Sequence, residues 1–140
     1  EIGLDMSRFP TPGHLCSWAK LAPGMNVSAG KKVGTSATGH GNRYLARVLG
    51  EVALAVGRTK TFLGQRYRRL ARRIGKKKAV VAIARSILAI IWHLLSDPTA
   101  RFHDLGVDFY DTHLNNNRRV RNHVRDLEAL GFKVTLELAA

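Results

Sequence analysis

The longest apolar stretch of the chain decides the fold; residues 76–98 read KKKAVVAIARSILAIIWHLLSDP. Residues 76–95 keep a helical pattern until Asp97 and Pro98 end it. The apolar part, residues 79–95, contains Arg85 and His93 and is shorter than the ~20 residues that a membrane span requires. Because apolar residues occupy nearly every side of this helix, other elements must cover it. We therefore expect it to be the central helix of one small domain.

Amphipathic helices are predicted on both sides of this central helix. Asn42 is a candidate N-cap for a helix whose inward positions are Leu45, Val48, Leu49, Val52 and Val56. Thr61 is a candidate N-cap for a second helix, which Gly75 ends and whose inward stripe is Leu63, Tyr67, Leu70 and Ile74. Shorter patterns predict a helix at 14–21 and another at 116–130, the latter with Val120, Val124, Leu127 and Leu130 inward and Gly131 as its stop.

The other segments complete a mainly α fold class. Glycines and small polar residues predict a flexible loop after residue 24, and residues 133–138 alternate like a short strand. We thus expect a small helical domain with a Gly-rich N-terminal loop and a short C-terminal strand. Its parts are a loop region at 1–41, a basic helical core at 42–96 and a helix-and-strand extension at 97–140.

Charge indicates the kind of partner. Lys and Arg number 23 against 10 acidic residues, for a net charge of +13, and Glu51 is the only acidic residue between Lys20 and Arg85. So large an imbalance favours a polyanionic partner, first of all nucleic acid, although solvated charge is the simpler alternative. The predicted phosphate-binding residues are Lys31, Lys32, Arg43, Arg47, Arg66, Arg69, Arg73, Lys76, Lys77 and Lys78.

Lys76, Lys77 and Lys78 stand where the helix macrodipole disfavours cations. A bound anion would explain them, and so would an exposed basic turn without function.

Residues that would indicate other chemistry are sparse. A single cysteine, Cys16, excludes an internal disulfide and fits reducing surroundings, and the six histidines lack the spacing of a zinc site. Asp104, Asp108 and Asp111 would share a helical face and could hold a divalent cation; solvation, or docking against the arginine-rich helix, is the preferred interpretation. The sequence contains no nucleophile elbow or phosphate-binding glycine motif.

Ser28 lies in the run PGMNVSAGKK at residues 23–32. A catalytic serine requires a base, or cations that stabilise its alkoxide, and Lys31, Lys32 and Arg43 could be those cations. By spacing alone, however, a serine in a glycine-rich loop is more often a turn residue.

Several ordered blocks carry a family resemblance. They are EIGLDMSRFP at 1–10, SAGK at 28–31, GNRYL at 41–45, GKKKA at 75–79, DLGVDFY at 104–110 and LEALGFKVTL at 127–136. With these blocks the chain resembles the C-terminal domain of the insertion-sequence transposases of the one-ten, one-sixteen and nine-oh-two families.

The resemblance implies a DNA recombinase of two parts. It implies that Ser28 attacks a DNA phosphodiester, while a separate N-terminal domain binds divalent metal through four acidic residues. We expect residues 1–140 to be an N-terminally truncated transposase domain, inactive alone, and cytoplasmic rather than membrane-bound. Its expected partners are DNA, a guide RNA in some relatives, the N-terminal domain and further copies of the full-length protein. The alternatives are a non-catalytic nucleic-acid-binding scaffold and an interaction domain whose apolar surface meets the missing half.

Overall fold

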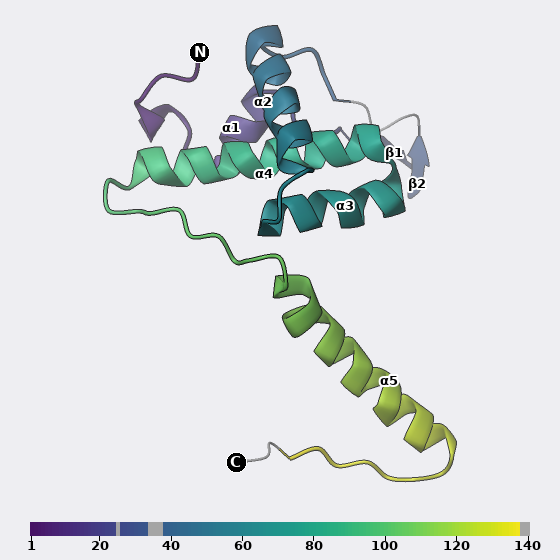
Figure 1. The fold of residues 1–140 in the computed structure, drawn as a ribbon. Coiled ribbons are helices and arrows are strands. Elements are labelled where there is room, and N and C mark those ends of the chain that lie inside the picture. The colour runs from purple at the N-terminus through teal and green to yellow at the C-terminus, as the bar shows by residue number, and fades with distance from the viewer. Residues whose placement is uncertain (25, 34–37, 138–140) are drawn as a thin grey trace.

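The computed structural model describes residues 1–24, 26–33 and 38–137, and it is mainly helical, as predicted (Figure 1). The chain forms a 3₁₀ turn and a short helix, then a small hairpin, then three longer helices, and ends with a π-helical turn and a final helix. In chain order these are η1 (Met6–Arg8), α1 (Pro12–Trp18), β1 (Asn26–Ser28), β2 (Lys31–Val33), α2 (Arg43–Val56), α3 (Phe62–Ile74), α4 (Lys76–Ser96), η2 (Tyr110–Leu114) and α5 (Asn115–Ala129).

The apolar stretch forms α4, and α4 is the central helix (Figure 1). Elements η1, α1, α2 and α3 all pack against it. Its fully covered residues recur on one stripe and are Ala79, Ile83, Ala84 and Leu88. By length and composition alone α4 could also cross a membrane, but a core helix passes the same test, and the packing of four elements against α4 fits a core helix.

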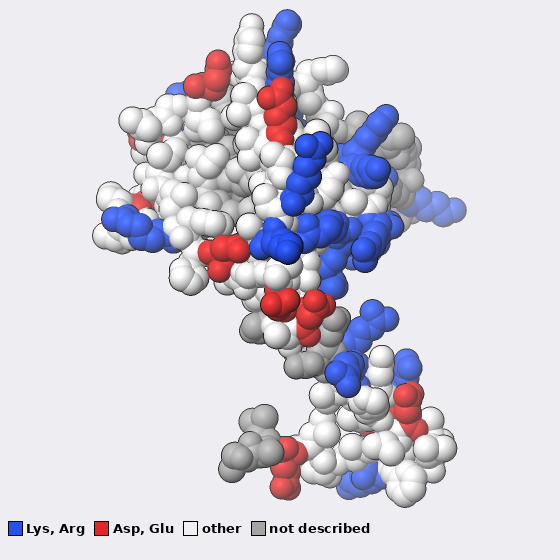
Figure 2. Space-filling model, in the orientation of Figure 1, with Lys and Arg blue, Asp and Glu red and all other residues white. Residues whose placement is uncertain are grey.

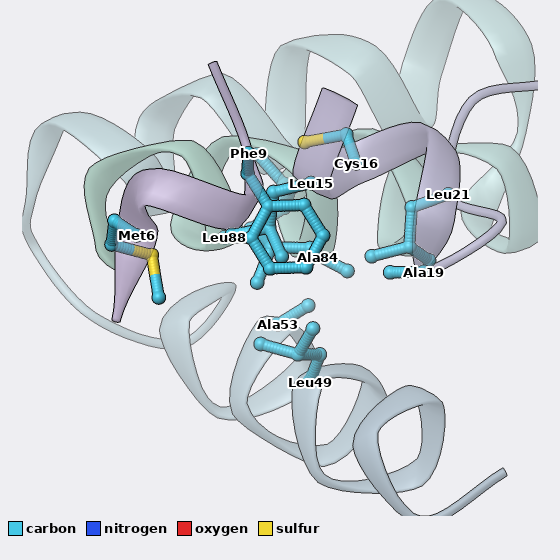
Figure 3. Packing of buried hydrophobic residues seen from close by; sticks show 11 residues of the cluster. Met6, Phe9, Leu15, Cys16, Ala19, Leu21, Leu49, Ala53, Ala84 and Leu88 are labelled. Carbon is cyan, nitrogen blue, oxygen red and sulfur yellow. The ribbon is translucent and has the colours of Figure 1, made fainter. Parts of the chain in front are cut away.

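The core lies between α1, α2 and α4 (Figure 3). Leu15, Ile83 and Leu88 are completely buried, and Leu49 and Ala53 of α2 face them. At the edge of this cluster, the indole Nε1 of Trp92 donates a hydrogen bond of 2.8 Å to the carbonyl oxygen of the buried Phe9, which fastens the N-terminal segment to α4.

Local side-chain chemistry sets the helix ends. The Asn42 side chain accepts hydrogen bonds from the N–H groups of Tyr44 and Leu45 at 2.9 and 3.0 Å, and the Thr61 hydroxyl accepts one from Gly64 at 3.2 Å. Gly75 separates α3 from α4 with a φ of +86°, a conformation that suits glycine. These three predictions are confirmed.

Helix α1 differs from the prediction of 14–21. It begins at Pro12, after the N-cap Thr11, because proline is well suited to the first helical position. It ends at Trp18 because Lys20 takes a left-handed φ of 57° and the N–H of Leu21 turns back to the carbonyl of Cys16.

The inward stripes were only partly correct. Val48 is 55% exposed and Val52 is 39% exposed, because Leu49 and Ala53 are the residues of α2 that face the core. In α3 the end of the predicted stripe is open as well, since Ile74 is 37% exposed.

Part of the glycine-rich segment is a hairpin rather than a loop. Strands β1 and β2 pair antiparallel with Ser28 opposite Lys31, and the two residues between them, Ala29 and Gly30, have φ values of 50° and 75°. Two consecutive positive φ values are typical of the type I′ turn, whose twist matches that of a hairpin. Asn-Gly and Asp-Gly are the usual signals for this turn, and the sequence has Ala-Gly instead.

The C-terminal extension contains the predicted helix but not its predicted packing or strand. Val120, Leu127 and Leu130 are 44%, 43% and 74% exposed, and Val124 is half-buried, so this stripe does not enter the core. Residues 133–137 are irregular because no described strand lies beside them to complete a ladder, and Leu138 lies outside the described residues.

Candidate nucleic-acid interface

Ser28 is the last residue of β1, and its side chain is exposed. Its backbone position is fixed by pairing with Lys31 and by the tight turn that follows. In the described part of the chain the hairpin does not pack against any helix, so Ser28 stands clear of the core. A hydroxyl in this place is accessible to a large substrate.

Lys31 and Lys32 lie on the strand that pairs with Ser28. Lys31 is exposed and directly opposite Ser28, whereas Lys32 pairs with Val27 and its side chain lies outside the described part. Opposite residues in an antiparallel pair have Cβ atoms roughly 4.5–5.5 Å apart. The hairpin therefore places the side chains of Ser28 and Lys31 at neighbouring Cβ positions.

Arginine and lysine gather over α3 and the end of the helical body where α3 meets α4, while the other end of the same face is mostly uncharged (Figure 2). Arg73 is exposed close to the end of α3, and the three lysines at the start of α4 are exposed as well. In the described residues none of these four cations has an ion-pair partner. Their charges are therefore available to a phosphate group.

The start of α4 has no capping side chain and no acidic residue in its first turn. Its first backbone N–H groups therefore lack a side-chain acceptor, and Lys76, Lys77 and Lys78 lie around them.

The arginines in the middle of α3 have contacts of their own. The guanidinium of Arg69 lies over the ring of Tyr110 at 4.6 Å from its centroid, and the Phe62 ring stacks on the same tyrosine at 5.2 Å. Arg66 is half-buried and lines a groove that also contains Phe62 and His93. Arg69 thus contacts the connector between α4 and α5 through Tyr110, and Arg66 lines a groove that Phe102 and Leu105 of the connector also line.

Arg43 and Arg47 lie elsewhere. They are in the first turns of α2, at the end of that helix away from α3 (Figure 1). The guanidinium of Arg43 lies over the Tyr44 ring at 5.8 Å, and Arg47 Nε lies 3.0 Å from Glu51 Oε1. The ten predicted residues therefore do not form a single cluster.

Arg68 has a structural role that the sequence did not reveal. Its guanidinium donates hydrogen bonds to the carbonyl oxygens of Gly57 and Thr59, at 3.1 and 2.9 Å, and so fixes the turn between α2 and α3. In the sequence Arg68 is one of several arginines on α3, and nothing in its spacing distinguishes it from the others.

The acidic connector docks against α3, as the preferred interpretation predicted. Asp104 accepts a hydrogen bond from the backbone N–H of Phe62 at 3.1 Å, and Asp111 accepts one from the Gln65 amide at 3.3 Å. In the part of the chain that the structure describes, no three His, Cys, Asp or Glu side chains come together as metal ligands. Within the described residues, Asp104, Asp108 and Asp111 therefore do not come together as the divalent-cation site considered in the sequence analysis.

Cys16 is a poor competitor as a nucleophile. It is 1% exposed, its Sγ lies 3.7 Å from the carbonyl oxygen of Arg85, and burial raises the pKa of its thiol. The exposed hydroxyl of Ser28 is the more accessible group.

Comparison with known proteins finds a family match for the N-terminal part of the chain. Residues 1–68, which include the hairpin, α2 and the start of α3, match the model of the family described as Transposase IS116/IS110/IS902. No curated protein and no solved structure matches the chain. Residues 1–68, just under half of the chain, are thus similar to the IS116/IS110/IS902 family of transposases.

Proposed function

We propose that this chain binds DNA during the transposition of an insertion sequence and that Ser28 is the nucleophile that opens a DNA phosphodiester bond. The match of residues 1–68 to a transposase family model supports a role in transposition. The observation that carries the finer proposal is the position of Ser28, exposed at the tip of a hairpin and directly opposite Lys31.

The proposed reaction is a transesterification. The Ser28 hydroxyl gives its proton to a solvent base as Oγ bonds to phosphorus, and the bond from phosphorus to one bridging oxygen of the DNA breaks. That oxygen takes up a proton and leaves as a free hydroxyl end. One phosphate ester replaces another, so the reverse reaction can rejoin strands without a further energy source.

The cations have two roles in this proposal. Lys31 would stabilise the negative charge that develops on the phosphate oxygens beside Ser28. The cations at the α3–α4 junction would hold the DNA backbone through phosphate contacts, which carry no sequence information. The resemblance places a divalent metal in the separate N-terminal domain and implies a guide RNA in some relatives, and no step here depends on either of them.

The test is the loss of a covalent protein–DNA adduct. In a recombination assay with radiolabelled DNA and the full-length protein that contains this chain, the Ser28→Ala variant should lose the adduct that survives denaturing electrophoresis, but keep its DNA affinity. Ser17→Ala is the matched control, because Ser17 is also an exposed serine but lies on α1. If the Ser28→Ala variant recombines DNA and forms the adduct at the original level, Ser28 is not the nucleophile. The non-catalytic basic scaffold would then be the favoured function.

A further inference from the structure

Helix α5 has a polar face that no part of the described chain covers. In the described residues only η2, the turn that leads into it, packs against α5, and the helix projects away from the helical body (Figure 1). Arg118, Asn122 and Arg125 are exposed and follow one another at spacings of four and three residues. At 3.6 residues per turn they lie within about 60° of one another around the helix. They form one narrow face, the α5 polar face, opposite the apolar residues of the helix.

The positive charge of the α5 polar face is only weakly compensated. In the described part of the chain Arg118 takes part in neither ion pair. Arg125 Nη2 lies 3.8 Å from Asp126 Oδ1, and the two side chains are 76% and 67% exposed. An ion pair so long and so exposed contributes little, so a polyanion can replace it. The acidic residues of α5 follow Arg125, which leaves the first part of the helix positively charged.

The residue types on this face suit the reading of bases. Lysines, such as the three at the start of α4, are point charges that suit phosphate groups. An arginine can form two hydrogen bonds with the edge of a guanine, and an asparagine can do the same with an adenine. The phosphate contacts proposed for the α3–α4 junction carry no sequence information, so a second element is required to read sequence.

The shape of α5 favours duplex DNA over duplex RNA. Its 15 residues make a rod about 22 Å long, and an α-helix fits the major groove of B-form DNA. The major groove of A-form RNA is too deep and narrow to admit one. Lys and Arg continue from the surface over α3 onto the first half of α5, with acidic residues between them (Figure 2). Both sets of cations therefore lie on the same side of the molecule.

We propose that α5 is a recognition helix that enters the major groove of duplex DNA, where Arg118, Asn122 and Arg125 form hydrogen bonds with base edges. The cations at the α3–α4 junction then supply affinity that does not depend on sequence, and α5 supplies a sequence preference. This inference rests on the DNA binding of the proposed function, but not on Ser28 as the nucleophile. It concerns a segment beyond the family match, which ends at residue 68.

The test measures sequence preference with the whole chain after nuclease treatment. Repeated selection from a pool of random-sequence DNA duplexes should enrich a common sequence. Fluorescence anisotropy then gives the ratio of the affinities for the selected duplex and for a scrambled one. Arg118→Ala and Asn122→Ala should each lower this ratio by about tenfold, as expected for the loss of one bidentate base contact. A pool without an enriched sequence, or an unchanged ratio in both variants, would overturn the proposal.

Two further variants distinguish base contacts from charge. Arg119→Ala is the matched control, because it removes the same charge about 100° away around the helix, and it should leave the ratio unchanged. Arg118→Lys keeps the charge but loses the planar guanidinium, so it should lower the ratio and keep the salt dependence. Melting temperatures should stay constant, since α5 lies outside the core. If Arg119→Ala lowers the ratio as much as Arg118→Ala, or if Arg118→Lys keeps it, α5 contributes charge alone and the proposal is wrong.

The same assay separates this inference from the proposed function. If replacing the three lysines at the start of α4 with Gln weakens DNA binding and the α5 variants bind as the wild type does, only the recognition helix is wrong. A chain that binds no DNA contradicts both proposals. An RNA duplex of the selected sequence that competes as well as the DNA would also overturn the inference, because α5 cannot enter its major groove.

Discussion

Gly64 shows how a single residue controls helix packing. A Cβ atom at this position would lie 2.4 Å from the Thr59 carbonyl oxygen and 2.7 Å from that of Val56, so only glycine allows α3 to start this close to the end of α2. We predict that Gly64→Ala lowers the free energy of unfolding by about 1–3 kcal/mol, the usual cost of overpacking.

The control for this prediction is Gly50 in the middle of α2, where a Cβ would meet nothing within 4 Å. Gly50→Ala should raise the free energy of unfolding by about 0.5–1 kcal/mol, because alanine favours the helix. Urea denaturation of both variants measures the two effects. Equal stability of the two variants would contradict the packing described here.

Cys16 provides a second prediction at the residue scale. Burial raises the pKa of its thiol and blocks access to it, so the folded chain should react with Ellman's reagent at pH 8 far more slowly than the urea-unfolded chain. Because the pKa is raised, a shift to lower pH should slow the reaction further. Rapid, stoichiometric labelling of the folded protein would show that α1 does not pack on α4 as described.

At the scale of elements, the lysines at the start of α4 should affect both the stability of the free chain and its affinity for DNA. Lys76, Lys77 and Lys78 oppose the helix macrodipole, so replacing all three with Gln should stabilise the free chain, by about 0.3–1 kcal/mol per charge at low salt. The same change should weaken DNA binding if these lysines hold a phosphate. Thermal melts and fluorescence anisotropy measure the two effects. If stability and affinity both rise, or both fall, the anion-site interpretation is wrong.

The helix ends could be predicted because single residues determine them. Asn42, Thr61 and Gly75 act locally, through a side-chain acceptor or a permitted backbone angle, and their effect is visible in the sequence. The outward orientation of Val48 could not be predicted, because the face of α2 that is buried depends on where α4 and α1 lie. The prediction of a strand near the C-terminus was wrong for a related reason. A strand requires a neighbouring strand to pair with, and the local sequence does not show whether one lies beside it.

At the scale of the whole molecule, charge should dominate DNA binding. A plot of log affinity against log salt should have a steep negative slope, and Arg73→Gln should reduce the magnitude of that slope by about 1 if Arg73 contacts a phosphate. Arg47→Gln is the control, because Arg47 is already paired with Glu51 and lies away from α3. Equal changes for the two variants would mean that the binding surface is not the one over α3.

The candidate site shows what the sequence could and could not contribute. The abundance of cations in residues 20–85 was visible in the sequence, and so was the run that contains Ser28. The pairing of Ser28 with Lys31 was not, since it depends on a turn built from Ala29 and Gly30 without the usual asparagine or aspartate. The sequence also could not distinguish Arg68, which donates hydrogen bonds to backbone carbonyl oxygens, from the other arginines of α3.

The most direct test of the central claim is to identify the residue that becomes linked to DNA. The adduct formed during recombination would be isolated under denaturing conditions, digested with protease and nuclease, and analysed by tandem mass spectrometry. We expect a nucleotide remnant on Ser28, in the peptide that precedes Lys31. A remnant on any other residue would contradict it.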